Sequence, residues 1–181
     1  MSSKIDTDIL KPFLEDPQRE FHLREFARIH KISPTTAGKI LENLRKDNYL
    51  LKKKERGHLL YRANTDSVEY KYLKAFYNVS KINDSGLVDF LVDEFNYPEA
   101  IVLFGSYAKS ENTPKSDIDI FVLSEIKKEP EVSRFEKALK CKIQLFSANR
   151  AKFNQMSKDS KELLNNILNG RILYGYLEVF R

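Results

Sequence analysis

The 181-residue sequence contains only one cysteine and three histidines, which limits the kinds of site it can build. A single thiol excludes an intramolecular disulfide and a zinc site made of several thiolates. His22, His30 and His58 do not have metal-ligand spacing, so we expect each to be structural or exposed. Cys141 is expected to start a strand and is interpreted as a small buried hydrophobic residue. No Ser–His–Asp or Cys–His set indicates a covalent nucleophile.

Long apolar runs are also missing from the sequence. No run approaches the roughly 20 residues of a membrane-spanning helix, and the N-terminus does not resemble a secretory signal. Neither an internal repeat nor a low-complexity segment is present, and 41% hydrophobic residues is ordinary for a globular chain. We therefore expect a soluble, cytoplasmic protein with one large domain or two small ones.

Positive charge is concentrated in one part of the chain. The formal net charge is +5, and residues 33–62 alone carry 8 basic and 3 acidic residues. Residues 67–181 are almost balanced, with 17 basic and 16 acidic residues. The basic block indicates a nucleic-acid-binding surface in the N-terminal part.

The pattern of the N-terminal part predicts three short helices. The first ends before Pro17, and the third begins with Ser33 as its N-cap and Pro34 at its first position. Lys31 and Ile32 form the turn between the second and third helices. The apolar positions that define the three helices in turn are Ile5, Ile9, Leu10 and Phe13; Leu23, Phe26 and Ala27; and Ala37, Ile40, Leu41 and Leu44.

A β-hairpin is expected to follow, with strands at Tyr49–Glu55 and His58–Ala63 joined by Arg56 and Gly57. Over residues 4–64 this order of elements resembles the winged helix-turn-helix domains of microbial regulators. The third helix would then enter the major groove of double-stranded DNA, and the hairpin cations would meet phosphates. The candidate DNA-binding residues are Thr35, Thr36, Lys39 and Asn43 on the helix and Lys52, Lys53, Lys54, Arg56 and Arg62 on the hairpin.

The sequence also leaves open an alternative function for this region and its oligomeric state. The alternative to DNA binding is a protein-interaction module whose basic face is simply solvated. A homodimer is an expectation because winged-helix proteins often bind two-fold symmetric sites.

Residues 67–84 are expected to form a helical linker. Tyr72, Phe76 and Val79 share one face at helical spacing, which predicts that they pack against the protein. Base stacking by the aromatic residues of this segment is the alternative. The segment Asn83–Gly86 should end this helix, and another amphipathic helix should follow.

The most informative motif lies between residues 101 and 123. Ile101–Phe104 is expected to be a buried strand, Gly105 allows a sharp turn, and Ser106 offers a hydroxyl that could cap a short helix. Asp117 and Asp119 begin a second strand and point the same way, about 7 Å apart. Since Mg²⁺ favours a few carboxylates together with substrate phosphate oxygens, the motif suits a metal-bound nucleoside triphosphate.

Residues 101–123 closely resemble the signature of the minimal nucleotidyltransferases of the polymerase-beta-like superfamily, and the resemblance extends over roughly residues 85–175. It implies a mixed sheet flanked by helices and, with the N-terminal part, an α/β (α+β) chain. It further implies Mg²⁺ or Mn²⁺ at the catalytic candidates Asp117 and Asp119, with ATP or another triphosphate as substrate. The candidate nucleotide-binding residues are Gly105, Ser106, Lys109, Lys115 and Ser116.

Three positions depart from the family pattern: Lys109 replaces the arginine that is common there, Ser110 replaces a frequent glycine, and the third is Gln144. Gln144 stands where these enzymes place a third carboxylate, and an amide can neither act as a base nor bind a second cation as strongly. The sequence therefore leaves two functions open. One is transfer of a nucleoside monophosphate, with AMP as the expected group, to an acceptor. The resemblance implies that the acceptor could be a protein, because some relatives are antitoxins that modify a helical toxin partner. The other is a DNA-binding regulator whose nucleotidyltransferase-like half only binds nucleotide or mediates assembly.

The expected organisation is a winged helix domain at residues 1–66, a helical linker at 67–84 and a nucleotidyltransferase-like domain at 85–181. In the last domain, residues 132–139 are expected to form a helix and Ile143–Phe146 a strand. Two helical segments ending near Gly170 and a short apolar run at residues 172–174 that docks on the domain complete the prediction.

Overall fold

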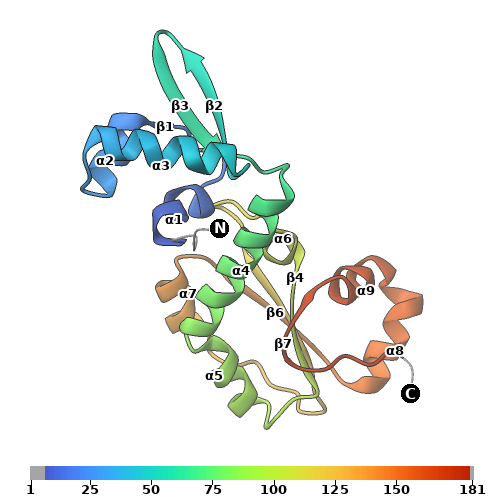
Figure 1. Cartoon of the computed structure of the whole chain (residues 1–181). Coiled ribbons are helices and arrows are strands. Elements are labelled where there is room, and N and C mark those ends of the chain that lie inside the picture. Colours follow the sequence, from blue (N-terminus) through green and yellow to red (C-terminus); the bar gives the residue numbers. More distant parts are fainter. Residues whose placement is uncertain (1–6, 180–181) are drawn as a thin grey trace. The chain divides into compact units, whose positions relative to one another are not determined.

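The computed structural model describes residues 7–179 (Figure 1). The chain divides into two compact units, one extending to Tyr77 and the other beginning at Asn78, and each is described by itself. This division falls inside the segment expected to be a linker. Ile5, expected in the first helix, lies outside the described residues. Within residues 7–179 no helix is both long and apolar enough to cross a membrane.

The first unit contains the three predicted helices: α1 (Thr7–Glu15), α2 (Leu23–Ile29) and α3 (Pro34–Lys46). The predicted start of α3 is confirmed, because the Ser33 hydroxyl accepts a hydrogen bond from the Thr36 N–H at 3.1 Å and Pro34 is the first helical residue. The helices bury one apolar face each around a common core. That core includes Leu10, Phe13, Phe26, Ala37 and Leu41.

The predicted hairpin is also confirmed, with β2 (Leu50–Glu55) antiparallel to β3 (His58–Ala63). Arg56 and Gly57 turn the chain with φ of 47° and 82°, the left-handed conformation that a two-residue hairpin loop requires. A two-residue strand, β1 (Phe21–His22), pairs with the other edge of β3 and was not predicted. Two residues are too short to show a strand period, and only their partner reveals them.

Helix α4 (Val68–Asp84) forms as expected, but the prediction of its packing face was wrong. Tyr72 and Phe76 are 71% and 64% exposed, and only Val79 of the three packs partly against a core. The buried face instead carries polar groups that bond to backbone.

Within the first unit, the Tyr70 hydroxyl donates to the Phe13 carbonyl at 2.9 Å, and the Lys74 ammonium donates to the Leu14 carbonyl at 2.6 Å. Both carbonyls belong to the last turn of α1, where carbonyl groups have no partner inside their helix. Because Tyr and Lys combine a long apolar body with a polar end, they bury well when that end finds an acceptor. A pattern based on apolar residues alone overlooks this face.

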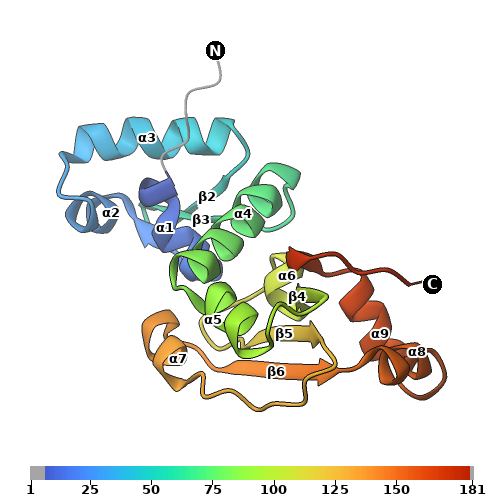
Figure 2. The same ribbon diagram turned by 90° about the horizontal axis from the view of Figure 1, so that it is seen from below.

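The second unit is built on a four-stranded mixed sheet, as the resemblance implied (Figure 2). Its strands are β4 (Ala100–Phe104), β5 (Ile118–Leu123), β6 (Ile143–Ala148) and β7 (Arg171–Gly175), in the order β6-β5-β4-β7. β5 and β6 are parallel, whereas β4 is antiparallel to both β5 and β7. The apolar run at residues 172–174 therefore docks as part of an edge strand, through its pairing with β4.

Helices cover both faces of this sheet. One face packs with α5 (Leu87–Glu94) and α7 (Ser133–Leu139) through residues such as Ile101 and Ile120. The other face packs with α8 (Arg150–Asp159) and α9 (Lys161–Leu168) through residues such as Val102 and Phe121. Because neighbouring strand residues alternate between faces, Asp119 shares the second face with Phe121.

Candidate functional site

The end of β4 and the start of β5 lie side by side and bring the Gly105 turn to a carboxylate. Phe104 and Asp119 are directly paired across the two antiparallel strands. Gly105 has φ +68°, and a Cβ at this position would lie 2.2 Å from the Asp119 Oδ2 atom. Glycine is therefore needed here both for the backbone conformation and for the space that the carboxylate fills.

A second strand adds Gln144 to this cluster. Asp119 and Gln144 are partners in the parallel pairing of β5 and β6, which is the position expected from the sequence. The Gln144 Nε2 donates a hydrogen bond to Asp117 Oδ2 at 2.8 Å. The two carboxylates and the amide thus meet at one end of the sheet, and the amide already occupies one carboxylate oxygen of Asp117.

The electrostatics of this cluster favour a bound cation. Burial, and then the negative charge of Asp117, raise the pKa of Asp119 above its usual value. A divalent cation shared by the carboxylates would remove that repulsion, and carboxylate and amide oxygens are ligands that Mg²⁺ accepts. Among residues 7–179, no group of three or more His, Cys, Asp or Glu side chains could hold a metal ion. Asp117 and Asp119 supply only two carboxylates, so a cation held here would take its remaining ligands from a bound triphosphate and water.

The short helix α6 (Gly105–Lys109) follows β4 directly. Ser106 lies inside its first turn and does not cap it: the N-cap is Phe104, with no side-chain cap, so the capping role expected for Ser106 was wrong. The helix starts earlier than expected because Gly105 itself enters it. The first N–H groups of a helix have no acceptor within it, so Gly105 and Ser106 can offer N–H groups to an anion.

Lys109 ends α6, and its ammonium donates to the Asn166 side-chain oxygen of α9 at 3.0 Å. At the same end, Arg171 Nε donates to the Ala108 carbonyl at 3.0 Å and attaches α6 to β7. Both contacts join residues about 60 positions apart. The sequence pattern did not identify Asn166 or Arg171, because neither stands in a motif.

Lys115 and Ser116 lie in the loop that leads into β5, immediately before Asp117. Ser116 Oγ accepts a hydrogen bond from the Thr113 N–H at 3.0 Å and so shapes this loop. Lys115 is exposed and leaves its charge in solvent near the start of the strand. Cys141 is half-buried, less than expected, and burial raises the pKa of its thiol.

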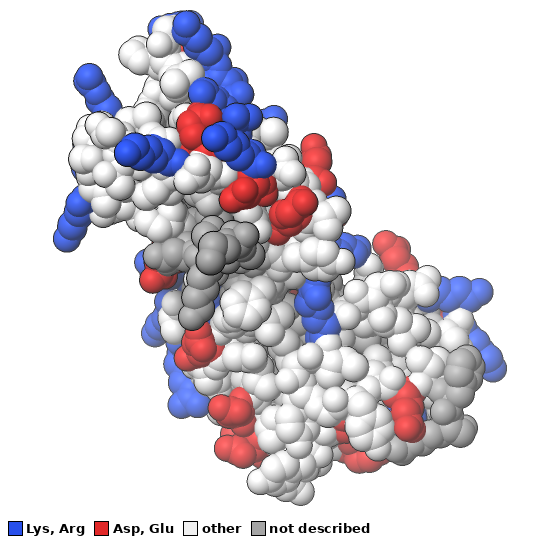
Figure 3. Space-filling model, viewed as in Figure 1, with Lys and Arg blue, Asp and Glu red and all other residues white. Residues whose placement is uncertain are grey.

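In the first unit, all four candidate DNA-binding residues of α3 are exposed. Thr35, Lys39 and Asn43 lie on the solvent side of the helix, as predicted from its apolar stripe. Thr36 is also exposed, but its hydroxyl is 2.8 Å from Ser33 Oγ and takes part in the N-terminal cap. Figure 3 shows Lys and Arg side chains gathered over the β2–β3 hairpin and along the neighbouring helix.

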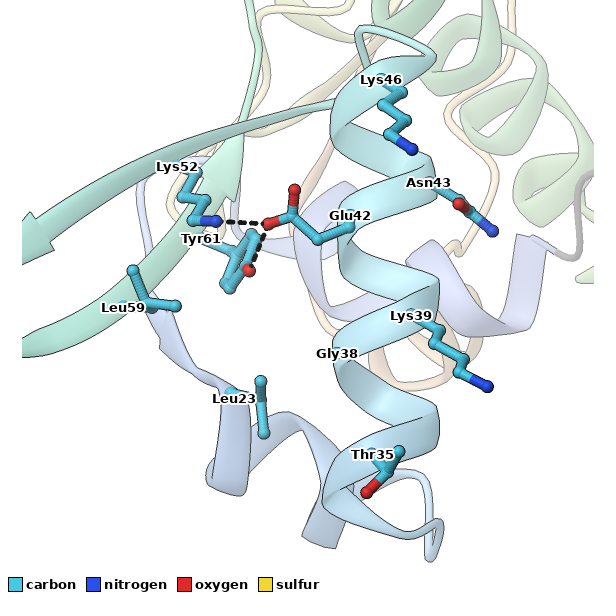
Figure 4. A pocket seen from close by; sticks show the side chains of 10 residues that line it. All are labelled: Leu23, Thr35, Gly38, Lys39, Glu42, Asn43, Lys46, Lys52, Leu59 and Tyr61. Carbon is cyan, nitrogen blue, oxygen red and sulfur yellow. Dashed lines mark hydrogen bonds and ion pairs between the residues drawn. The ribbon is translucent and has the colours of Figure 1, made fainter.

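An open groove of about 590 Å³ separates α3 from the hairpin. Figure 4 shows Glu42 pointing across it from α3, toward Lys52 and Tyr61. Glu42 Oε1 accepts from the Lys52 ammonium at 2.6 Å and from the Tyr61 hydroxyl at 2.8 Å, and Oε2 accepts from Arg45 Nε at 3.1 Å. The groove is lined by Leu23, Thr35, Gly38, Lys39, Glu42, Asn43, Lys46, Lys52, Leu59 and Tyr61.

These donors hold the pKa of Glu42 down to about 2, with the hydrogen bond from Lys52 as the largest cause, followed by those from Tyr61 and Arg45. Lys53 is paired as well, with Glu20 at 2.8 Å and Glu55 at 2.9 Å. Lys52 and Lys53 therefore have different ion-pair partners, which their neighbouring positions in the sequence could not show.

The chain belongs to the polymerase beta nucleotidyltransferase family, whose model matches residues 87–178, just over half of its length. The match extends from the first helix of the second unit through the sheet and contains the whole Gly105, Asp117, Asp119 and Gln144 cluster. The resemblance inferred from residues 101–123 is confirmed at this level. A comparison with curated proteins gave no match.

Proposed function

We propose that the second unit binds a metal–nucleoside triphosphate and transfers its nucleoside monophosphate to an acceptor. AMP is the nucleoside monophosphate we propose. The observation that carries this proposal is the approach of Gly105, which follows β4, to Asp119 of β5, with Asp117 immediately before that strand. The turn leaves the backbone accessible, and the two carboxylates supply the negative charge that a divalent cation needs. Family membership of residues 87–178 supports the same reaction class.

In this mechanism the residues of the chain mainly position the triphosphate and neutralise its negative charge. Asp117 and Asp119 orient the metal-bound triphosphate, Gly105 and Ser106 face its phosphates, and a lysine at 109 or 115 offsets its charge. A bound Mg²⁺ or Mn²⁺ would supply positive charge between the carboxylates and the phosphates. An acceptor hydroxyl attacks the α-phosphorus, the bond to the leaving group breaks, and pyrophosphate departs. Gln144 cannot take the hydroxyl proton, so that proton passes to water.

We further propose that the first unit is a winged helix-turn-helix module that binds double-stranded DNA. Support comes from a capped third helix with exposed Thr35, Lys39 and Asn43, and from a hairpin that carries Lys54 and Arg56 at its far end. The proposed domains are residues 1–66 for this module, 67–84 for a helical linker and 85–181 for the nucleotidyltransferase-like domain. A protein acceptor, in particular a helical toxin partner, would make the chain an autoregulated cytoplasmic antitoxin, and a homodimer would suit a two-fold DNA site.

The experiment that tests transfer is labelling with α-³²P-ATP and Mg²⁺ or Mn²⁺, offered to the protein itself and to proteins of its host lysate. Radioactive protein that disappears in Asp117→Ala supports transfer and reveals the acceptor. Labelling that persists in this variant would show that another site or a contaminant is responsible. Binding to a duplex DNA is measured in parallel, because Asp117→Ala should leave it unchanged.

One observation favours a second function. The Gln144 amide bonded to Asp117 Oδ2 replaces a carboxylate and lowers the negative charge of the site. A unit of this kind could bind nucleotide without transferring it, and nucleotide binding would then regulate DNA binding. Absence of labelling together with metal-dependent ATP binding, and an ATP-dependent DNA affinity that Asp119→Asn abolishes, would support this function instead.

A further inference from the structure

The basic residues of the hairpin divide between its two faces. Residues paired across antiparallel strands lie on the same face, and neighbours along a strand alternate. Lys52 pairs with Tyr61 and Lys54 pairs with Leu59. Because Tyr61 and Leu59 both line the groove beside α3, Lys52 and Lys54 belong to the groove face.

The opposite face carries Lys53 and Arg62. Lys53 pairs with Leu60, and Arg62 pairs with Leu51, so both alternate with the groove residues. Lys53 is also held by Glu20, which precedes β1, and by Glu55. Two of the five candidate hairpin cations thus lie away from α3.

On the groove face, Lys52 and Lys54 differ in their partners. Lys52 donates to Glu42 at 2.6 Å, and its side chain is 31% exposed. Within residues 7–179, Lys54 and Arg56 form no ion pair, and both are exposed toward the hairpin turn. A phosphate that approached Lys52 would have to replace a carboxylate with three hydrogen-bond donors, whereas Lys54 and Arg56 need only release water and counterions.

We infer that Glu42 is a positioning residue that ties the hairpin to α3 and withdraws Lys52 from DNA, so that phosphates of a duplex are bound by Lys54 and Arg56 on the hairpin and by Lys39 and Lys46 on α3. This inference rests on the proposed DNA-binding function of the first unit. It assigns different roles to three consecutive lysines. Lys52 joins the hairpin to α3 through Glu42, Lys53 forms ion pairs on the face away from α3, and Lys54 contacts the nucleic acid.

The test compares Lys54→Ala with Lys53→Ala in the full chain, using a fluorescein-labelled duplex DNA and fluorescence anisotropy over a series of salt concentrations. Each phosphate contact adds about 0.9 to the slope of log K against log salt. Lys54→Ala should lower that slope by about 0.9 and weaken binding several-fold at low salt. Lys53→Ala removes the same charge from the adjacent position and should change neither quantity.

Glu42→Gln gives a second, opposite readout. The amide oxygen can still accept from Tyr61, but Lys52 is released, so the slope should rise by about 0.9. A merely structural role for Glu42 would weaken binding without steepening the slope. Equal slopes for Lys53→Ala and Lys54→Ala, or an unchanged slope in Glu42→Gln, would overturn the inference while leaving DNA binding intact.

Failure of the unaltered protein to bind any duplex at low salt would instead overturn the DNA-binding proposal and this inference with it. A duplex RNA of the same sequence is measured as a competitor. If it displaced the DNA at lower concentration than unlabelled DNA does, duplex DNA would be the wrong ligand. Circular dichroism spectra of the variants check that each retains the fold.

Discussion

The Gln144 amide donates to Asp117 Oδ2 at 2.8 Å, so one oxygen of the first carboxylate is bonded inside the protein. In the parallel pairing of β5 and β6, Gln144 is also the direct partner of Asp119. The amide therefore bonds to one of the two groups that would hold a cation and lies on the strand beside the other. Its chemistry decides how much negative charge this end of the sheet presents.

Gln144→Asp should increase transfer of label from α-³²P-ATP tenfold or more. A carboxylate at this position can accept the proton of the attacking hydroxyl, a role that is typically worth about 10²–10⁴-fold, and it also strengthens cation binding. The measurement is the initial rate of labelling at saturating Mg²⁺. Gln144→Asn is the matched control, because it shortens the side chain equally but adds no charge, and it should give no increase. An unchanged rate in a folded Gln144→Asp protein would argue against a transferase site.

Asp119→Asn should abolish transfer and raise the thermal stability of the metal-free protein. Burial and the charge of Asp117 raise the pKa of Asp119, so the folded state disfavours its ionised form. For an acid with a raised folded pKa, stability is lost as pH increases from the unfolded value of 3.8 through the folded value, and the loss persists at pH 7. Removing the charge removes that loss. Thermal unfolding with and without Mg²⁺ measures both effects.

In that experiment Mg²⁺ should raise the melting temperature of the unaltered protein, since a ligand that binds only the folded state stabilises it. It should have little effect on Asp119→Asn. A variant that melts at a lower temperature without metal, or that gains as much from Mg²⁺ as the unaltered protein, would contradict the assignment of Asp119 to the cation.

Gly105→Ala should remove metal-dependent ATP binding, and Gly86→Ala should not. Both glycines have positive φ, 68° and 76°, so each substitution costs about 1–2 kcal/mol of backbone strain. Only at Gly105 would the new Cβ meet Asp119 Oδ2, at 2.2 Å, whereas nothing lies within 4 Å at Gly86. ATP binding by isothermal titration calorimetry separates the two. Comparable loss in both variants would mean that stability, rather than the shape of the turn, limits binding.

The elements that the sequence predicted are those that local chemistry determines. Ser33 and Pro34 begin α3 because a side-chain cap and a missing N–H both suit a helix start. Gly57 favours a turn after the first hairpin strand because glycine adopts the left-handed conformation without strain. The juxtaposition of Gly105 with Asp119 was likewise predictable from a strand–turn–strand motif, since the two strands are close in the chain.

Features that depend on distant partners were not predictable in this way. The edge strand β7 is a strand only because β4 offers its hydrogen bonds, and β1 depends on β3 in the same manner. Tyr72 and Phe76 were expected to pack, yet Tyr70 and Lys74 do so because carbonyl groups of α1 satisfy their polar ends. Lys52 forms its ion pair with Glu42, ten positions away in the chain. A count of charges in the sequence does not show this partner and therefore cannot distinguish Lys52 from its neighbouring lysines.

Glu42 should make the stability of the first unit depend on pH between about 4.5 and 2. Lys52, Tyr61 and Arg45 face its carboxylate and hold its pKa at about 2, below the unfolded value of 4.5. For an acid with a lowered folded pKa, the stabilisation is complete above the unfolded value and is lost as pH falls through the folded value. Because the group is partly exposed, we expect the stabilisation to be about 1 kcal/mol.

Glu42→Gln should therefore be less stable than the unaltered protein at pH 7, with the difference shrinking between pH 4.5 and 2. Thermal unfolding of the full chain, followed by circular dichroism at several pH values, measures it. Glu129→Gln serves as the control, because that residue is exposed in a loop of the other unit, and its stability should follow that of the unaltered protein at every pH. A difference between Glu42→Gln and the unaltered protein that stayed constant down to pH 2 would show that packing of the side chain, and not its charge, ties the hairpin to α3.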